Sequence, residues 1–457
     1  MTARLRFAPS PSGLLHQGNG RTAVWNWLYS RVLCGLFLLR IEDTDKARSS
    51  SENEAAILED LEWLGISPDK PLTRQSENSA DHIKAVEELK SAGKVYPCFC
   101  SAELLAAQRK EDLAVGKAPR YRGTCRVIPK ADAWVRAENE PHALRFAVDP
   151  GAQIVVDDLV RGQVRFSSTD LGDFIVRRND GAFSFFLANI IDDMRDAITH
   201  VLRGEDHLSN TPRQILIARS LGGEAPKYGH LGLVIGPGRE LLSKRDQSMS
   251  LKAHRAAGYT AEVIFDMLAR CGLDPRNNDI LDKETWIKVF DIDRISPGPS
   301  VFDLERLNNR NRKFIQSLSS DQLADRLAPL YADISPALAE LVRFEETTLV
   351  ELAAAARSIN ESPDPDGEAY ESLQSDEGRT ALQAWERALS ECDGSDFNSV
   401  AKKAASLSML SGKRLYFPLR AALMGKLSGP HLEPLFEFLG QEKSLLRIRR
   451  YLKSAAS

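Results

Sequence analysis

The sequence predicts an α/β domain built on a doubly wound parallel sheet, interrupted by an α+β insertion and followed by all-α domains. Residues 5–8 and 35–41 are apolar runs of strand character, and stretches with helical spacing of apolar residues alternate with them. Beyond Asp246 the chain is almost wholly helical in pattern. With 457 residues it is long enough for about three or more domains, each with its own core.

Composition is that of an ordinary globular protein. Hydrophobic residues make up 43% and charged residues 27%, and no apolar run reaches transmembrane length. Arg4 and Arg6 are followed at once by turn residues, which is not a signal-peptide pattern, so cytoplasm is the expected compartment. The net charge of −4 does not advertise nucleic-acid binding, although a phosphate-binding surface is a local property and is not excluded.

The segment over residues 4–31 predicts an anion-binding turn. Its strand breaks at a cluster of Pro and Gly residues, and Gly18 and Gly20 then lead into a helix. Backbone amides and the helix dipole at such an N-terminus favour a phosphate, and His16 lies at the mouth of the turn. A packed turn without a ligand is the plainer interpretation, and this segment alone leaves it open.

The second expected strand, GLFLLRI over residues 35–41, is apolar enough to be buried in a parallel sheet. It ends in Glu42 and Asp43, with Arg48 shortly after. Charged residues just past the carboxyl end of a parallel strand lie where open α/β sheets bind ligands. A solvated acidic loop is the alternative.

Further helices are expected over about residues 53–64 and 81–92, and the second directs Ile83, Val86 and Leu89 inward. Strand-like runs over residues 153–166 and 173–177 belong to the insertion, and Ile198 to Leu202 alternates apolar and polar residues as a strand.

Three of the six cysteines lie close together in sequence. Cys98 and Cys100 form a C-x-C pair, and Cys125 follows after 24 residues. Three thiols from two turns suit a structural zinc ion, which requires four tetrahedral ligands, but the fourth is not obvious from the residue pattern. Three reduced thiols without a metal are the alternative, and the six cysteines are too sparse and too unevenly spaced to indicate a disulfide framework.

Four motifs together resemble one family. The run RFAPSPSG from Arg6, with His16 and Gly18, resembles the His-x-Gly phosphate signature of class I aminoacyl-tRNA synthetases in its glutamyl form. R-I-E-D-T-D-x-x-R at residues 40–48 is similar to a motif of glutamyl- and glutaminyl-tRNA synthetases, and L-S-K-R at 242–245 resembles the second class I signature. The pattern DGAFSFFLAN from Asp180 also resembles the family.

The resemblance covers essentially the whole chain and implies a bacterial-type glutamyl-tRNA synthetase with a Rossmann-like catalytic domain. The implied domains are a first catalytic half (1–84), an acceptor-stem-binding insertion (85–185), a second catalytic half with the S-K-R loop (186–245), a stem-contact domain (246–318) and helical anticodon-binding domains (319–457).

The resemblance also implies roles for individual residues. His16, Gly18 and Lys244 would support catalysis, and ATP would be bound by these residues with Arg48, Asp206, Ser243 and Arg245. Glutamate would be bound by Arg6, Ala8, Ser10, Glu42, Phe185, Asn189 and Arg203. The family usually has tyrosine at the position of Phe185, so one hydroxyl contact is missing. In a truncated relative a tyrosine completes the zinc site, which implies Cys98, Cys100, Tyr121 and Cys125 as ligands here.

Two guanidiniums, from Arg6 and Arg203, are chemically suited to an anionic side chain, because they can offer directed, bidentate hydrogen bonds. The implied reaction forms glutamyl-adenylate from L-glutamate and Mg²⁺-ATP and then transfers the glutamyl group to tRNA-Glu. Charging of tRNA-Gln stays open, and a monomer is the family expectation.

Four other classes of protein share some of these motifs but fit the sequence less well. A glutaminyl-tRNA synthetase has β-barrels where this chain looks helical, and a truncated relative that glutamylates a tRNA base would be shorter. Intact His16, Gly18 and Lys244 argue against a non-catalytic RNA-binding paralogue. A small-molecule nucleotidyltransferase would not explain the long helical tail. In that tail the basic residues Lys413, Arg414 and Arg420 lie close in sequence to the aromatic residues Tyr416 and Phe417. Such a combination is suited to binding unpaired anticodon bases.

Overall fold

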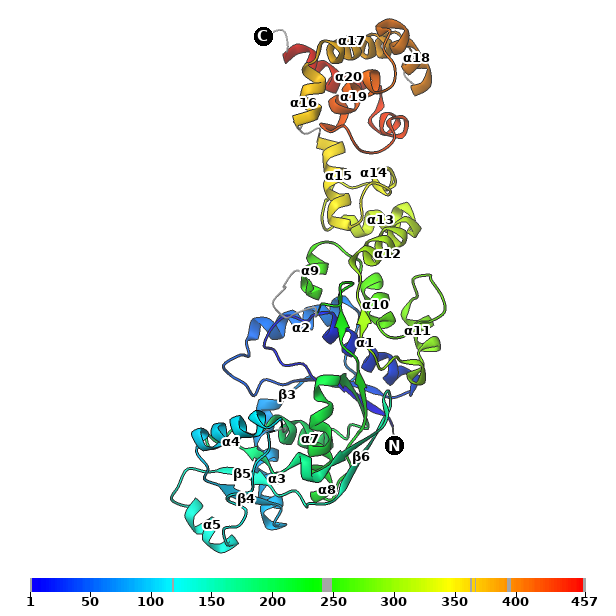
Figure 1. The fold of residues 1–457 in the computed structure, drawn as a ribbon. Coiled ribbons are helices and arrows are strands. Elements are labelled where there is room, and N and C mark those ends of the chain that lie inside the picture. Colours follow the sequence, from blue (N-terminus) through cyan, green and yellow to red (C-terminus); the bar gives the residue numbers. More distant parts are fainter. Residues whose placement is uncertain are drawn as a thin grey trace. The chain divides into compact units, whose positions relative to one another are not determined.

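The fold was analysed in a computed structural model (Figure 1). It describes residues 2–116, 119–240, 249–361, 364–365, 367–392 and 396–454. The chain divides into two compact units, Met1–His254 with Ile264–Asp303 and Arg255–Val263 with Leu304–Ser457. None of the helices in these described ranges is long and apolar enough to cross a membrane.

A five-stranded parallel sheet forms the centre of the first unit. Its strands lie in the order β10-β9-β1-β2-β3. They are β1 (Arg4–Phe7), β2 (Leu36–Ile41), β3 (Thr73–Arg74), β9 (His200–Gly204) and β10 (Lys227–Leu231). The strand order reverses between β1 and β9, and open α/β sheets bind ligands beyond the carboxyl ends of the strands at such a point. The predicted doubly wound sheet is confirmed.

Helices connect these strands and flank the sheet. They are α1 (Gln17–Val32), α2 (Ser51–Trp63), α3 (Ser79–Ser91), α7 (Phe185–Arg195) and α8 (Thr211–Ser220), with short 3₁₀ turns at Gln75–Asn78 and Glu205–Asn210. The helices expected at 53–64 and 81–92 therefore begin two residues earlier than predicted and end one residue earlier.

The inward face predicted for α3 was partly wrong. Val86 and Leu89 are buried, but Ile83 is 56% exposed and His82, only 1% exposed, lies inward instead. His82 Nε2 donates to Asp192 Oδ1 at 3.0 Å, and this polar contact turns the buried face by one residue.

The insertion is an α+β unit of two small sheets. The strands β4 (Val95–Cys98), β5 (Ala143–Phe146) and β8 (Phe174–Arg177) form an antiparallel sheet, and β6 (Gln153–Asp158) pairs with β7 (Gly162–Ser167) as a hairpin. The helices α4 (Ala102–Ala114), α5 (Lys130–Ala137) and α6 (Ser168–Leu171) accompany them. Leu159 N at the hairpin turn donates to Tyr228 O at 2.8 Å, which ties this hairpin to β10.

The first unit closes with segments from after the insertion. The short strands β11 (Val234–Ile235) and β12 (Ser300–Val301) pair in parallel, and α11 (Lys283–Val289) and the 3₁₀ turn Ile292–Arg294 lie between them in sequence. Residues 249–272, in which Val263, Ile264, Met267 and Leu268 have helical spacing, form two helices, α9 (Leu251–Ala256) and α10 (Ala261–Arg270). Gly258 has φ of +84° between them, and that backbone conformation cannot continue a helix.

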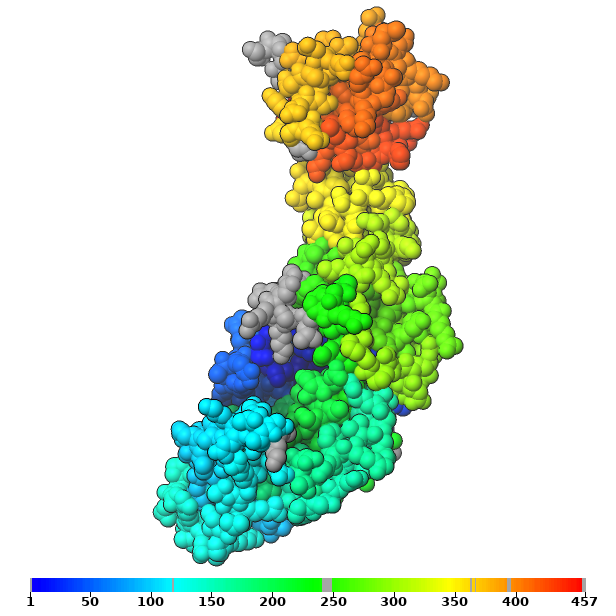
Figure 2. Space-filling model, in the orientation of Figure 1, coloured from blue at the N-terminus to red at the C-terminus, as the bar shows by residue number. Residues whose placement is uncertain are grey.

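The second unit is helical throughout its described residues. Its helices are α12 (Leu304–Ser317), α13 (Ser320–Leu327), α14 (Pro336–Val342), α15 (Leu349–Glu361), α16 (Gly367–Gln374), α17 (Asp376–Glu391), α18 (Phe397–Ser408), α19 (Lys413–Met424) and α20 (Leu432–Ser454). One apolar core runs from Ile315 to Ile448. In Figure 2 the orange-to-red helices form one closely packed mass.

Candidate active site

The carboxyl ends of the parallel strands gather four of the predicted glutamate-binding residues. Arg6 lies on β1, Glu42 follows β2, Asn189 lies on α7 and Arg203 lies on β9. All four are buried, with exposed fractions of 6% or less. Charged side chains in such a place need partners, and the partners of the two arginines differ.

Arg6 is already neutralised by the protein. Its Nε donates to Asp193 Oδ1 and its Nη2 to Asp193 Oδ2, both at 3.2 Å. Asp193 is fully buried on α7, and burial alone would raise its pKa, but Arg6 and Arg40 together hold the pKa of this carboxyl below its ordinary value. Asp193 was not predicted as a site residue.

Asn189 links the predicted residues to one another. Its Nδ2 donates to Glu42 Oε1, and its Oδ1 accepts from Gln214 Nε2 at 2.7 Å and from Arg6 Nη2 at 3.3 Å. Burial raises the pKa of Glu42, with Arg40, Arg6 and Asn189 opposing it. The site thus holds a carboxylate that is only partly compensated by the protein, which suits an ammonium ligand.

A buried ion network supports this arrangement from behind. Arg40, 1% exposed on β2, donates to Asp193 Oδ1 at 2.8 Å and lies within 3.7 Å of Asp192 and 3.5 Å of Asp196. Asp192 also accepts from Gln75 Nε2 at 2.8 Å. The sequence offered one signal for this network, because Arg40 and the pair Asp192-Asp193 stand inside apolar runs, and buried charges must be paired.

Arg203 differs from Arg6 because its hydrogen-bond partners are all neutral. Its Nη2 donates to Thr211 Oγ1 at 2.8 Å and to Gln214 Oε1 at 2.7 Å, and its Nε donates to His230 Nε2 at 3.1 Å. Its guanidinium lies over the Tyr228 ring, 4.5 Å from the centroid. Within the described residues Nη1 has no hydrogen-bond partner, and burial lowers the pKa of Arg203 to about 10. An anion would relieve this uncompensated buried cation.

The predicted phosphate-binding turn has the expected geometry. His16 is the N-cap of α1, and its Nδ1 accepts from Gly18 N at 3.1 Å. Leu251 N donates to Leu15 O at 2.9 Å, so the segment after the S-K-R motif returns beside this turn. Ser243, Lys244 and Arg245 themselves lie outside the described residues.

The other predicted site residues are less closely grouped. Ala8 is half-buried and Ser10 is exposed in the loop after β1. The Phe185 ring lies 5.1 Å from the ring of His207, and the neighbouring Asp206 is exposed. Arg48, with a side chain 77% exposed, pairs with the neighbouring Asp45.

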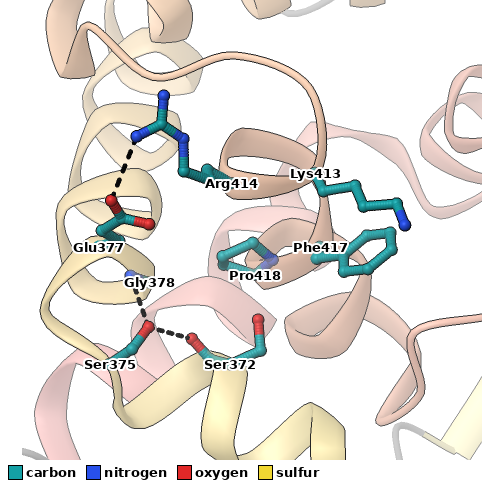
Figure 3. A pocket seen from close by; sticks show the side chains of 8 residues that line it. All are labelled: Ser372, Ser375, Glu377, Gly378, Lys413, Arg414, Phe417 and Pro418. Carbon is teal, nitrogen blue, oxygen red and sulfur yellow. Dashed lines mark hydrogen bonds and ion pairs between the residues drawn. The ribbon is translucent and has the colours of Figure 1, made fainter.

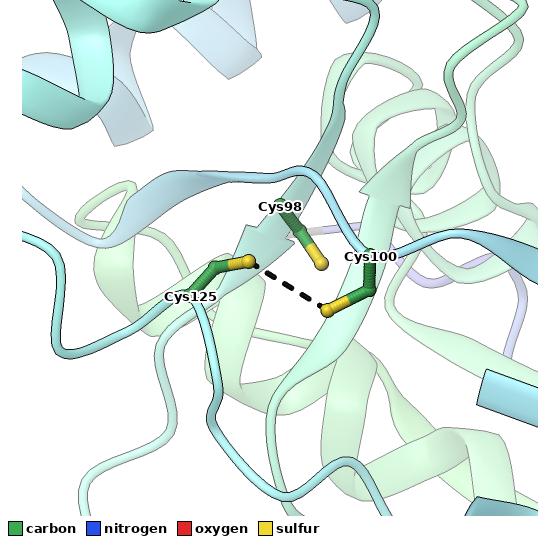
Figure 4. A group of neighbouring side chains, drawn as sticks. All are labelled: Cys98, Cys100 and Cys125. Atoms are coloured by element: carbon green, nitrogen blue, oxygen red, sulfur yellow. Dashed lines mark hydrogen bonds between the residues drawn. The ribbon is translucent and has the colours of Figure 1, made fainter. Parts of the chain in front are cut away.

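The three cysteines of the insertion meet in space, as predicted (Figure 4). The sulfur atoms of Cys98, Cys100 and Cys125 all lie within 4.8 Å of one another, and those of Cys100 and Cys125 are 3.6 Å apart. The Tyr121 hydroxyl lies 3.5 Å from Cys98 Sγ and 3.7 Å from Cys100 Sγ, and it accepts from Cys125 N at 2.8 Å.

A neighbouring arginine, which was not predicted, completes this cluster. Arg145, 6% exposed, donates from Nε to Cys98 Sγ at 3.2 Å and lies 3.7 Å above the Tyr121 ring. Burial alone would raise the pKa of Cys98, but contacts with Arg145 and Tyr121 lower it, whereas burial raises the pKa of Cys100 to about 11. The thiols and the phenol are groups that can bind a metal ion, and the Arg145 guanidinium favours the thiolate form of Cys98 that metal binding requires.

The second unit carries a small basic pocket (Figure 3). It is lined by Ser372, Ser375, Glu377, Gly378, Lys413, Arg414, Phe417 and Pro418. Lys413 Nζ lies 5.5 Å from the Phe417 ring centroid, and Arg414 pairs with Glu377 at 3.3 Å. On α12, Arg306, Arg312 and Lys313 are exposed and supply local positive charge, whereas Arg310 is only 8% exposed.

Comparison with known families agrees with this fold and site. The family described as tRNA synthetases class I (E and Q), catalytic domain, matches residues 2–309. The family described as anticodon binding domain matches residues 313–452. The parallel sheet, the His-capped α1 and the helical second unit thus belong to a class I tRNA synthetase.

Full-length relatives define the family further. The chain is 40% identical to glutamate–tRNA ligase 2 of Nitrosococcus oceani, with 99% of this chain and 98% of the relative covered. It is 37% identical to glutamate–tRNA ligase of Carboxydothermus hydrogenoformans, with coverage of 97% and 98%. A crystal structure of a glutamate tRNA ligase from Elizabethkingia meningosepticum, in complex with its amino acid, superposes with a TM-score of 0.86 at 28% identity over 100% of both chains. The chain belongs to the glutamate–tRNA ligase family.

Proposed function

We propose that this protein activates L-glutamate with Mg²⁺-ATP and transfers the glutamyl group to the 3′ end of tRNA-Glu. The observation that carries the proposal is the buried guanidinium of Arg203, which has only neutral partners and an unpaired Nη1. A side-chain carboxylate of the substrate would supply the missing charge, whereas the neutral amide of glutamine would not.

The neighbouring groups suit the rest of the amino acid and ATP. Glu42 offers a carboxylate for the substrate amino group. Because His16 Nδ1 accepts from Gly18, the neutral imidazole carries its proton on Nε2, the tautomer that can donate to a phosphate oxygen. The S-K-R motif would place Lys244 on the leaving pyrophosphate, and Mg²⁺ would spread the phosphate charge. Catalysis then consists of positioning and charge stabilisation, without a covalent protein intermediate.

The test is attachment of glutamate to separate transcripts of tRNA-Glu and tRNA-Gln by the purified protein with ATP and Mg²⁺. Charging of tRNA-Glu is expected, and the tRNA-Gln arm decides whether the enzyme discriminates between them. His16→Ala and Lys244→Ala should each slow adenylate formation by orders of magnitude while glutamate binding falls far less. No charging of either transcript would overturn the proposal.

The cysteine cluster fits one structural zinc ion. Cys98, Cys100 and Cys125 would supply three thiolates and Tyr121 the fourth ligand, and the ion would hold the insertion's loops together. Val127 stands where some family members have a histidine, and the Tyr121 hydroxyl lies 3.5 Å from Cys98 Sγ and 3.7 Å from Cys100 Sγ.

We expect about one zinc per chain in protein purified without added metal, measured by elemental analysis. Cys100→Ser should lower the zinc content strongly, and Tyr121→Phe should weaken retention against a chelator. Cys392→Ser, which changes a cysteine of the second unit, is the matched control. A substoichiometric content in the wild type would refute the zinc assignment.

The second unit would bind the anticodon arm. The Lys413–Phe417 pair offers a cation and a ring face, the chemistry that holds unpaired RNA bases. We further propose that the enzyme works as a monomer in the cytoplasm, where its tRNA substrate is charged.

A further inference from the structure

Arg203 is held in place by a chain of hydrogen bonds that starts at the insertion. Asp158, at the end of β6, contacts His230 on β10, and His230 contacts Arg203 on β9. Asp158 Oδ2 accepts from His230 Nδ1, and His230 Nε2 accepts from Arg203 Nε at 3.1 Å. Asp158 and His230 are 5% and 0% exposed. None of the sequence motifs assigned a role to either residue.

The backbone fixes the Asp158 carboxylate firmly. Its Oδ1 accepts from Val160 N at 3.0 Å, Arg161 N at 2.9 Å and His230 N at 3.1 Å. Oδ2 is therefore left for the imidazole. A carboxylate accepts hydrogen bonds only, so His230 must carry its proton on Nδ1.

This tautomer determines what His230 can do for Arg203. With the proton on Nδ1, the lone pair on Nε2 points at the donors Arg203 Nε and Thr211 Oγ1, the latter at 3.0 Å. A guanidinium can only donate, so the opposite tautomer would place two donors face to face. The two remaining sides of the Arg203 guanidinium are occupied by Gln214 and the Tyr228 ring, which leaves Nη1 for a ligand.

We propose that Asp158 and His230 are positioning residues for glutamate recognition, which fix the tautomer of His230 and thereby aim Arg203 Nη1 at the substrate's side-chain carboxylate. This inference rests on the proposed role of Arg203. The hairpin β6–β7 is thus part of the amino-acid specificity apparatus, although it belongs to the insertion and contributes no group that touches the substrate.

Substitutions that change the tautomer without changing the shape test the proposal. Asp158→Asn keeps the Oδ1 acceptor for the three backbone N–H groups but presents an amide N–H to His230, so the imidazole must shift its proton to Nε2. In Ser-His-Asp triads, replacing the aspartate by asparagine likewise imposes the wrong tautomer on the histidine. The site described here resembles such a triad only in that a carboxylate fixes the histidine tautomer. His230→Asn keeps a donor toward Asp158 and removes the acceptor for Arg203, whereas His230→Gln can place an amide oxygen at the Nε2 position.

The measurement is KM for glutamate and kcat of charging for the full-length variants. Asp158→Asn and His230→Asn should each raise KM for glutamate about tenfold or more, with kcat and KM for ATP changed much less, because the lost contact is to a charged group. His230→Gln should stay within about threefold of the wild type. Asp157→Asn, on the same hairpin but exposed and hydrogen-bonded to Gln163, is the matched control.

The outcomes separate this inference from the proposed function. If Arg203→Gln raises KM for glutamate but Asp158→Asn and His230→Asn do not, the positioning role is wrong while the proposed function stands. If His230→Gln raises KM for glutamate as much as His230→Asn does, the positioning role is also wrong. The shape of the imidazole, rather than an acceptor atom at the Nε2 position, would then determine KM. If Arg203→Gln itself leaves KM for glutamate unchanged, the substrate role of Arg203 and this inference fail together.

Discussion

The two arginines at the carboxyl ends of β1 and β9 differ in charge balance. Arg6 has a bidentate carboxylate partner in Asp193, whereas Arg203 has none. Removing the partner of a buried charge costs far more than the pair contributes, because the remaining ion stays desolvated. Asp193 therefore supports both the fold and the orientation of Arg6.

Asp193→Asn should lower the free energy of unfolding of the first unit by about 3 kcal/mol, since Arg6 and Arg40 both lose a buried anion. Urea denaturation followed by tryptophan fluorescence measures this, because five of the six tryptophans lie in the first unit. Glu140→Gln removes the exposed pair with Arg136 and should cost far less, because solvent screens that pair. Equal losses in the two variants would contradict the argument.

His254 gives the first unit a defined response to acid. It is 3% exposed beside Gln17, and burial lowers its pKa to about 4 from an ordinary value of 6.5. Above pH 6.5 the group is neutral in both the folded and unfolded chain. Between pH 6.5 and 4 the unfolded chain binds the proton first, so stability falls as the pH falls, and below pH 4 this contribution is constant.

His254→Gln should accordingly flatten the pH dependence of unfolding between pH 6.5 and 4, by up to about 3 kcal/mol over that range. Urea midpoints at several pH values provide the measurement. His431→Gln changes an exposed histidine and is the control. If the free energy of unfolding of both variants depends on pH as steeply as that of the wild type, burial of His254 does not cause this dependence.

At the scale of elements, the backbone of the connection after β10 packs directly against the backbone of the segment before β12. A Cβ on Gly232 would lie 2.1 Å from Gly298 O, in the segment that leads into β12. Arg21 of α1 donates to Gly232 O and thereby fixes the same turn to the helix that begins at His16. The atoms that this Cβ would meet, in Gly298 and Pro297, all belong to the backbone and cannot move aside as the end of a side chain could.

Gly232→Ala should therefore destabilise the first unit by about 2 kcal/mol or more, as overpacking against backbone does. Gly298→Ala is a matched control from the other side of the same contact, because its Cβ would meet only Ser296 Oγ at 3.7 Å. The loss of stability is measured by urea denaturation. A Gly298→Ala variant as destabilised as Gly232→Ala would show that the loop, rather than the close approach, determines the cost.

The predictability of the site also depends on these elements. His16, Asn189 and Arg203 could be predicted because each stands in a short motif whose neighbours in sequence carry its meaning. The roles of Asp158, His230 and Arg145 could not be predicted. Their partners lie on segments far away in sequence, and neither segment contains a pattern that indicates which other segment it will contact. Arg40 and Asp193 lie between these cases: their burial was predictable from the apolar runs around them, but their pairing across 153 residues was not.

At the scale of the whole molecule, the two units differ in secondary structure. The first unit has the parallel sheet and the insertion, and the second is helical in its described residues. The sheet and the helical C-terminal region were predicted from apolar periodicity, which depends on local sequence, whereas the bounds of the insertion came from the family resemblance. The four boundaries between the predicted domains remain predictions, and the described helical residues share one apolar core from Ile315 to Ile448.

The chain has a net charge of −4 and yet belongs to a family that binds tRNA, so phosphate contacts must come from local groups of basic residues. Raising KCl from about 50 to about 200 mM should raise KM for tRNA about tenfold or more, because counterions compete for these contacts. KM for glutamate should change far less, since Arg203 and Glu42 are buried and poorly screened. Steady-state charging at both salt concentrations tests this, and equal changes in the two KM values would contradict it.

The unpaired Arg203 guanidinium has a consequence for inhibitor chemistry. A molecule that competes for this pocket must bring a full negative charge to Nη1, so sulfonate or phosphonate analogues of the substrate are better starting points than esters or amides. Such compounds should also raise the melting temperature of the protein more than uncharged analogues of equal size, because they neutralise a cation that the folded chain otherwise keeps buried without a counterion.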